Sequence, residues 1–250
     1  MVQRMPRCCC CCRAPVAIGK SNFGAVIPLL ADSFRVLCVS YDGFDETEQT
    51  EFSTMVEEAE KIEAYLKTHC GGHIRAAYGC SLGGSFVGLL AARQNIHMDY
   101  GILGSSDLDQ ASPLAASLQT DFLLPLIYPV VRDGKIKAKF LQKCLDKCAK
   151  ESGDYAKAFL KMFGDARPYV TMQSCKNQFY SDLITPLPDK IYIPGTEIHI
   201  FYALKMGKKY RARYQRHFAH PVLHEQNLQH EELLACHPGQ WAQLVKSIAL

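Results

Sequence analysis

The segment Gly79-Cys80-Ser81-Leu82-Gly83 constrains the fold of this chain most strongly, because it reads G-x-S-x-G with Ser81 at its centre. A short β-like run at 74–78 precedes it, and an apolar run with helical spacing follows it to about Arg93. Strand, tight turn and helix form the context in which this motif exposes a serine nucleophile. The flanking glycines leave room for the crowded backbone of such a turn. We therefore predict that Ser81 is a nucleophile and that the Leu82 amide faces the oxyanion formed during attack; a glycine–serine turn without a catalytic role is the alternative.

Strands and helices alternate over the first 104 residues. A helix begins after Thr54, which has Glu57 three positions on in a capping-box pattern, and the glycines at 71–72 close it. This alternation predicts an α/β fold with a mostly parallel, doubly wound sheet, whose binding crevice lies beyond the carboxyl ends of the strands. Asp42, Ser81 and Asp107 each follow a predicted strand. The predicted strands are 14–19, 35–41, 74–78 and 100–104, and the predicted helices are 23–31, 54–70 and 82–93.

The alternation stops at about residue 110. Apolar and amphipathic runs at 118–131, 135–149, 155–163 and 167–183 predict a helical insertion, too long to be a connection, and the lysines of the second run are expected to form a solvated face. A strand at 197–203 and a final helix that begins at Pro238 then complete the sheet. We expect a sheet core from 15–109 and 191–250, a helical insertion at 110–190, and a disordered tail at 1–14 that adds nothing to the core.

The composition limits the partners. A net charge of +3 is too small to favour nucleic acid. We find no apolar run long enough to cross a bilayer and no secretory signal among the first 20 residues, so a cytoplasmic protein is expected. Of the twelve cysteines, five form the run Cys8–Cys12, and seven are scattered as buried thiols in a reducing compartment would be. The run is assigned to the tail, with soft-metal binding or lipidation as alternatives; no metal or cofactor is predicted.

Four features of this sequence resemble an α/β-hydrolase. They are the strand–turn–helix segment around Ser81 (the nucleophile elbow), the Asp42-Gly43 step after the preceding strand, the helical insertion, and a late histidine followed by a final helix. The resemblance covers about 15–250 and implies an inserted helical cap over the active site. It also implies the chain order nucleophile, acid, histidine. His230, in the segment before the final helix, is the histidine that the resemblance selects, with His224 and His237 as alternatives.

The sequence departs from this family in two places. The family normally has an acid after the strand at 197–203, where this chain has Lys205-Met206-Gly207-Lys208-Lys209-Tyr210 and no carboxylate. Asp107, after the preceding strand, is the preferred replacement, with Asp109 and then Glu225 as alternatives. The family also has a His-Gly step after an earlier strand, where this chain has Ala17-Ile18-Gly19-Lys20-Ser21, so Gly19 is left as the second oxyanion donor.

Two functions are consistent with this pattern. The first is a serine hydrolase of a small ester, thioester or amide, in which Ser81 attacks the carbonyl, His230 carries the proton and Asp107 orients the imidazole. Its partner is a small acyl substrate, and hydrolysis of a carbon–carbon bond would use the same residues. The second is a catalytically weak or inactive binding protein of the same fold, suggested by the two departures from the family.

Overall fold

A six-stranded sheet forms the centre of the molecule, and every neighbouring pair of its strands is parallel. The computed structural model describes residues 8–12, 23–151, 153–163 and 167–250. The strand order is β2-β1-β3-β4-β5-β6, so the prediction of a mostly parallel α/β sheet is confirmed. The strands are β1 (Cys8–Cys12), β2 (Arg35–Cys38), β3 (His73–Cys80), β4 (His97–Gly104), β5 (Glu197–Ala203) and β6 (Val222–Gln226).

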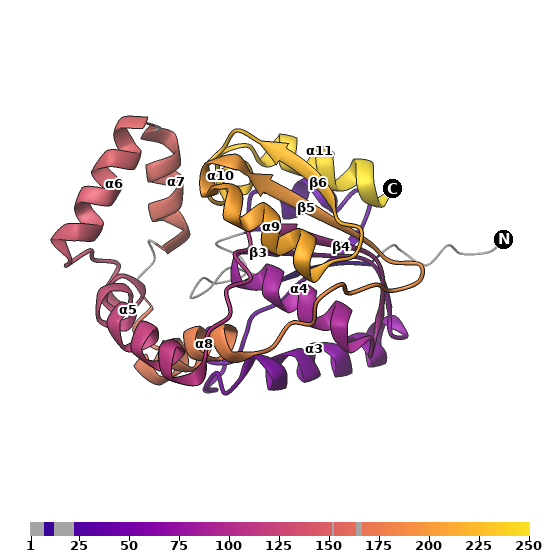
Figure 1. Cartoon of the computed structure of the whole chain (residues 1–250), viewed down its shortest axis with the longest axis horizontal. Coiled ribbons are helices and arrows are strands. Elements are labelled where there is room, and N and C mark those ends of the chain that lie inside the picture. The colour runs from indigo at the N-terminus through magenta and orange to yellow at the C-terminus, as the bar shows by residue number, and fades with distance from the viewer. Residues whose placement is uncertain (1–7, 13–22, 152, 164–166) are drawn as a thin grey trace.

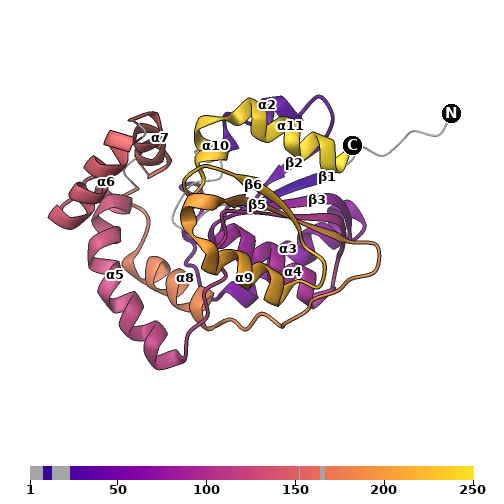
Figure 2. The same ribbon diagram turned by 45° about the horizontal axis from the view of Figure 1, so that its top comes forward.

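Helices cover both faces of this sheet, which gives the molecule three layers (Figure 1 and Figure 2). The helices α3 (Met55–Cys70), α4 (Leu82–Arg93) and α9 (Lys208–His217) pack on one face. The helices α2 (Ile27–Leu30) and α11 (Pro238–Ala249) pack on the other, with α10 (Glu232–Cys236) between β6 and α11. Each face therefore has its own hydrophobic core, as a sheet buried on both sides requires.

The ends of α3 follow directly from its sequence. The Thr54 hydroxyl accepts a hydrogen bond from the Glu57 backbone N–H (3.2 Å), which satisfies one of the free donors of the first turn. At the other end Gly71 adopts the left-handed conformation (φ 64°) that closes a helix without steric cost. This helix is therefore well predicted at both ends.

The cysteine run is strand β1, in the interior of the sheet, and our expectation that residues 1–12 lie outside the core is wrong for Cys8 and Cys9. Cys9 pairs with Val36 of β2 on one side and with Ala76 of β3 on the other. Cys8 belongs to the core on the α3 side and Cys9 to the core on the α11 side. Cysteine packs as a small hydrophobic residue, and a short continuous apolar run is typical of a strand buried on both faces. The remainder of the predicted tail and the predicted strand at 14–19 lie outside the described residues.

The described chain between β4 and β5 forms four helices joined by loops and contributes no strand to the sheet. Its helices are α5 (Pro113–Asp133), α6 (Lys139–Glu151), α7 (Gly153–Phe163) and α8 (Met172–Ile184). The helices α5 and α8 pack together, while α6 and α7 stand away from the sheet, to the left in Figure 1. These four helices lie within residues 113–184.

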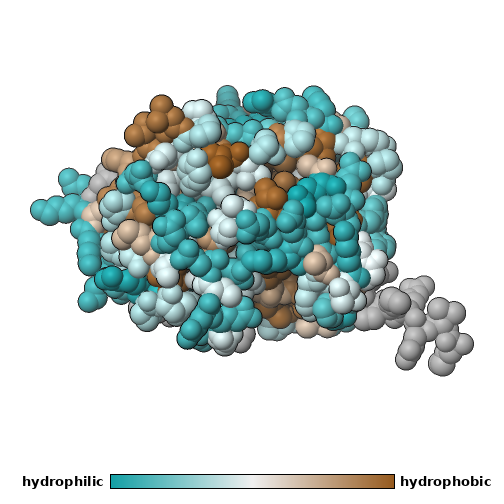
Figure 3. Space-filling view, turned by 90° about the horizontal axis from the view of Figure 1, so that it is seen from below, coloured by the Kyte–Doolittle hydropathy of each residue, from teal (hydrophilic) through white to brown (hydrophobic). Residues whose placement is uncertain are grey.

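The expectation that no apolar run could cross a bilayer is wrong for α5. By length and composition alone, this helix is long and apolar enough to do so. Its buried residues include Ala116, Thr120 and Leu124, so its composition also serves the packing of this helix in the protein. Leu114 and Phe122 remain exposed. The face of the molecule seen from below carries separate hydrophobic patches between hydrophilic residues (Figure 3).

Two elements near the C-terminus were not predicted. Strand β6 pairs with β5 at the sheet edge, and its sequence VLHEQ contains one short apolar pair only. The basic stretch after β5 is α9, whose apolar contact with the core comes from Tyr214, buried among the residues of the α3 and α4 face. A buried tyrosine and a buried histidine in a run of lysines and arginines give too weak an apolar period for this helix to be recognised in the sequence.

Candidate active site

Ser81 lies between the end of β3 and the start of α4, in a backbone conformation that serine rarely adopts (φ 51°, ψ −122°). The turn is tight, because a Cβ atom on Gly79 would lie 1.9 Å from the carbonyl oxygen of Gly83. On the opposite side a Cβ atom on Gly84 would lie 2.5 Å from the Cβ of Ser106 in the segment after β4. Gly84 was not singled out in the sequence, where only the two motif glycines were. The strand, strained serine and helix together form the geometry of a nucleophile elbow.

Strained residues gather around Ser81. Ser105 (φ 49°) and Leu108 (φ 47°) follow β4, and Glu231 (φ 59°) lies in the turn after β6. These three and Ser81 account for four of the six non-glycine residues with positive φ in the described chain. Such conformations cost on the order of 1–3 kcal/mol each, and they concentrate at functional sites. The carboxyl-terminal edge of the sheet at β3 and β4 is therefore the candidate site.

A cavity of about 140 Å³ opens at Ser81. The sheet edge contributes Ser81, Leu82, Asp107 and Asp109 to its lining. The helices α5 and α8 supply the opposite wall, with Gln119, Thr120, Leu123, Gln178, Phe179, Asp182 and Leu183. The cavity therefore lies between the sheet and the helical segment that follows β4.

His230 lies in the turn between β6 and α10, and its imidazole is partly exposed. Its Nε2 atom is 3.6 Å from Oε1 of Glu231, a residue that the sequence analysis did not consider. The backbone N–H of Glu231 donates to Ser105 Oγ (2.9 Å), which ties this turn to the segment after β4. Burial raises the pKa of the Glu231 carboxyl, and the His230 charge opposes that shift. In the described part of the chain, no hydrogen bond joins His230 to Ser81 or to Asp107.

The three predicted candidates for the acid lie in different surroundings. Asp107 borders the Ser81 cavity, and burial together with the Asp109 charge raises the pKa of its carboxyl. Asp109 borders the same cavity but pairs with Arg213 (2.5 Å). Glu225 of β6 pairs with Arg211 of α9, with 2.9 Å between Oε1 and Nη1. Of the three, Asp107 is the carboxylate at the cavity without an arginine partner among the described residues.

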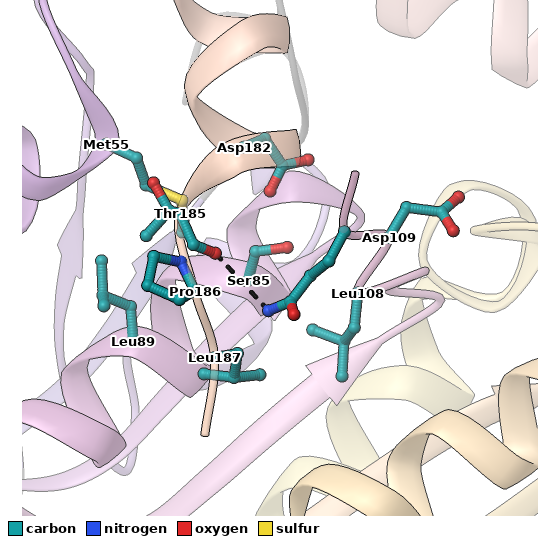
Figure 4. Close-up of a pocket in the computed structure, with 10 residues that line it drawn as sticks. Met55, Ser85, Leu89, Leu108, Asp109, Asp182, Thr185, Pro186 and Leu187 are labelled. Carbon is teal, nitrogen blue, oxygen red and sulfur yellow. Dashed lines mark hydrogen bonds between the residues drawn. The ribbon is translucent and has the colours of Figure 1, made fainter. Parts of the chain in front are cut away.

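Asp182 of α8 is a further carboxylate at this cavity that was not predicted from the sequence. It also borders a small adjoining pocket, drawn in Figure 4, together with Ser85 and Leu108. Burial raises the pKa of the Asp182 carboxyl well above its ordinary value, and the nearby Asp107 charge adds to that rise. No sequence motif marks Asp182, because only the packing of α8 against the sheet edge brings it to Ser81.

The alternative histidines are placed elsewhere. His224 stacks on His199, with its Nε2 atom 2.9 Å from His199 Nδ1, and burial lowers the pKa of both imidazoles. His237 lies between α10 and α11. Neither of these residues borders the Ser81 cavity, and His230 is not among its lining residues either. Leu82 begins α4 and so presents one of the free N–H groups of a helix start. Gly19 lies outside the described residues.

One group of described residues has ligand atoms close enough together for a metal ion, and it lies away from Ser81. The Nε2 atoms of His73 and His97 lie 2.7 Å and 3.4 Å from Oδ1 of Asp99, at the amino-terminal ends of β3 and β4. Arg75 donates to the other oxygen of Asp99 (2.8 Å). These contacts explain the group as an ion-pair cluster at the edge opposite the candidate site.

Comparison with solved structures places this architecture among the α/β-hydrolases. A protein from Desulfitobacterium hafniense described as an alpha/beta hydrolase family protein is 15% identical and has a TM-score of 0.77; the match covers 97% of this chain and 96% of that one. MenH from S. aureus is 12% identical, with a TM-score of 0.71 and coverage of 99% and 94%. A thermophilic esterase from Thermogutta terrifontis is 18% identical, with a TM-score of 0.69 and coverage of 96% and 88%. No protein-family model and no curated protein matches the sequence. At these identities the likeness shows a shared fold, and this chain has the α/β-hydrolase fold.

Proposed function

We propose that the protein is a serine hydrolase that cleaves a small ester, thioester or amide at Ser81. The observation that carries this proposal is the strained conformation of Ser81 at the start of α4, with its side chain on a cavity. A serine held in this way on a parallel sheet has little use other than as a nucleophile. The hydrolases and esterases among the proteins of similar fold support the same reaction class.

In the proposed reaction Ser81 Oγ attacks the substrate carbonyl while His230 takes the hydroxyl proton and later returns it to the leaving group. The N–H of Leu82 binds the oxyanion, and Gly19 is the proposed second donor. Asp107 orients the imidazole and stabilises its charged form. This assignment requires His230 to turn from Glu231 toward Ser81 when substrate binds, since catalytic hydrogen bonds are often loose before the substrate arrives.

The substrate is proposed to be compact. A cavity of about 140 Å³ leaves room for a small acyl group but not for a long chain. Leu123 and Phe179 make one wall apolar, and the helices at 110–190 are proposed to act as a cap that excludes water from the reaction. We place the protein in the cytoplasm, and no cofactor is part of this reaction.

Labelling with a fluorophosphonate probe tests this proposal, because only an activated serine reacts. The wild-type protein is expected to label, Ser81→Ala is expected not to, and Ser247→Ala, at an exposed serine of α11, is expected to label as the wild type does. The alternative is a catalytically weak or inactive binding protein, favoured by the missing hydrogen bonds between Ser81, His230 and Asp107. Absence of labelling in folded wild-type protein would establish that alternative and reject the hydrolase.

A further inference from the structure

We propose that Asp182 binds a positively charged group of the substrate, an ammonium or a guanidinium, so that the enzyme selects cationic acyl compounds. This inference rests on the proposed hydrolase and names its substrate class. A compact molecule whose carbonyl meets Ser81 can also reach Asp182, because both residues border the same cavity of about 140 Å³.

The Asp182 side chain comes from α8 and is directed into the space between that helix and the sheet edge. Figure 4 shows its carboxyl group on the side of the pocket where Ser85 lies, with Asp109 across from it. The floor of this pocket is apolar, formed by Leu89, Leu108 and Leu187 among others. A charged group in such surroundings depends on a nearby opposite charge.

The positive charges at this site are already engaged elsewhere. Arg213 pairs with Asp109 through Nη2 (2.5 Å) and donates to the backbone carbonyl of Asp107 through Nη1 (2.8 Å). Asp182 forms no ion pair with any lysine, arginine or histidine of the described residues. Three carboxyl groups therefore border the cavity, no lysine, arginine or histidine of the described residues lines it, and of the three carboxyl groups only that of Asp109 has an ion pair.

A second observation indicates a ligand in this cavity. Thr120 of α5 borders it and is only 1% exposed, yet its hydroxyl has no hydrogen-bond partner in the described structure. A buried hydroxyl without a partner costs about 1–3 kcal/mol, so native proteins rarely leave one. An N–H donor of the bound cation would supply that partner, since the hydroxyl oxygen can accept.

The charge state of Asp182 fits this role. Burial and the Asp107 and Asp109 charges raise the pKa of its carboxyl, so the charged form of Asp182 is disfavoured when no cation is bound. A bound cation supplies the missing opposite charge and favours the charged form of Asp182. Neutral substrates gain nothing from Asp182, and anionic substrates are repelled by all three carboxyl groups.

The test compares two small esters whose acyl groups differ at one end only, one with a primary ammonium group and the other with the isosteric methyl group. Wild-type kcat/KM is expected to be at least tenfold higher for the cationic ester, mainly through KM. Asp182→Asn is expected to lose that preference through a fall in kcat/KM for the ammonium ester. Asp189→Asn, at an exposed aspartate paired with Arg216, is the matched control and is expected to keep the preference.

The possible failures are distinguishable. Equal kcat/KM for the two esters, with Ser81 labelled, would overturn the cation site and leave the hydrolase standing. If neither ester is cleaved and Ser81 does not label, the proposed hydrolase activity is rejected. The cation site is then tested by the binding of a small cation. Methylammonium is expected to raise the melting temperature of the wild type and not that of Asp182→Asn. Equal shifts in the two proteins would reject the site.

Discussion

The carboxyl groups around Ser81 differ in the charges that face them. Asp109 pairs with Arg213, while the partly buried Asp107 and Asp182 and the buried Glu231 have no lysine or arginine ion pair among the described residues, and desolvation raises the pKa of each of these three. Neighbouring acids can take different roles in one site when their surroundings give them different pKa values. In the roles proposed above, Asp107 serves the imidazole and Asp182 serves the substrate.

At this residue scale, Asp107→Asn is expected to lower ester turnover by a factor on the order of 10³–10⁴, as loss of a triad acid can. The shape of the side chain hardly changes, so the melting temperature should stay close to that of the wild type. Turnover of the same ester by Asp109→Asn, Glu225→Gln and Glu231→Gln provides the comparison. The assignment of Asp107 fails if its variant keeps near wild-type turnover, and a large loss in Glu231→Gln instead would move the role to the carboxylate beside His230.

The raised pKa of Asp182 also predicts how stability depends on pH. A carboxyl group whose pKa is higher in the folded than in the unfolded chain binds more protons when folded. Its contribution therefore lowers the free energy of unfolding as the pH rises from the ordinary value of 3.8 toward the raised pKa. Asp182→Asn removes this contribution, so we expect the variant to be more stable than the wild type at pH 7 and to differ little near pH 3.5. Urea unfolding at the two pH values measures this, and a variant equally destabilised at both would contradict it.

At the scale of elements, the junction of β3 and α4 depends on a close approach of two backbones. Gly79→Ala would place a Cβ atom 1.9 Å from the Gly83 carbonyl oxygen, and neither atom belongs to a flexible side chain. We expect a loss of about 1–3 kcal/mol in the free energy of unfolding, as overpacking costs, together with loss of fluorophosphonate labelling. Gly239→Ala is the matched control, because no atom lies within 4 Å of the added Cβ in α11. Full labelling of Gly79→Ala would show that the turn tolerates a wider conformation.

The sequence predicts best those elements whose signals are local. The limits of α3 come from a cap and a glycine, and the elbow comes from five adjacent residues, so both lie where they were expected. Strand β1 was missed because a run of cysteines shows no alternation, although its burial on both faces needs none. Asp182 and Glu231 could not be predicted at the site. The packing of α8 places Asp182 at the cavity, and the turn after β6 places Glu231 beside His230.

At the scale of the whole molecule, β1 connects the two hydrophobic cores. It lies between β2 and β3, with Cys8 in the core on one face of the sheet and Cys9 in the core on the other. The thiol of Cys8 lies 3.6 Å from that of Cys70, and burial raises the Cys8 pKa to about 12. Thiolate chemistry at this position is therefore suppressed, and the strand acts through packing.

This arrangement makes the stability of the entire fold sensitive to Cys9. The side chain is fully buried, so Cys9→Ser would place a hydroxyl group in an apolar core. We expect the free energy of unfolding to fall by about 1–3 kcal/mol, the cost of an unpaired buried polar group. The exposed Cys38 of β2 is the matched control, and Cys38→Ser is expected to stay within about 0.5 kcal/mol of the wild type. Urea unfolding followed by tryptophan fluorescence is a suitable measurement, because Trp241 lies in the same core as Cys9. If the two variants are equally stable, the Cys9 side chain does not contribute to a buried core, and β1 does not join the two hydrophobic cores.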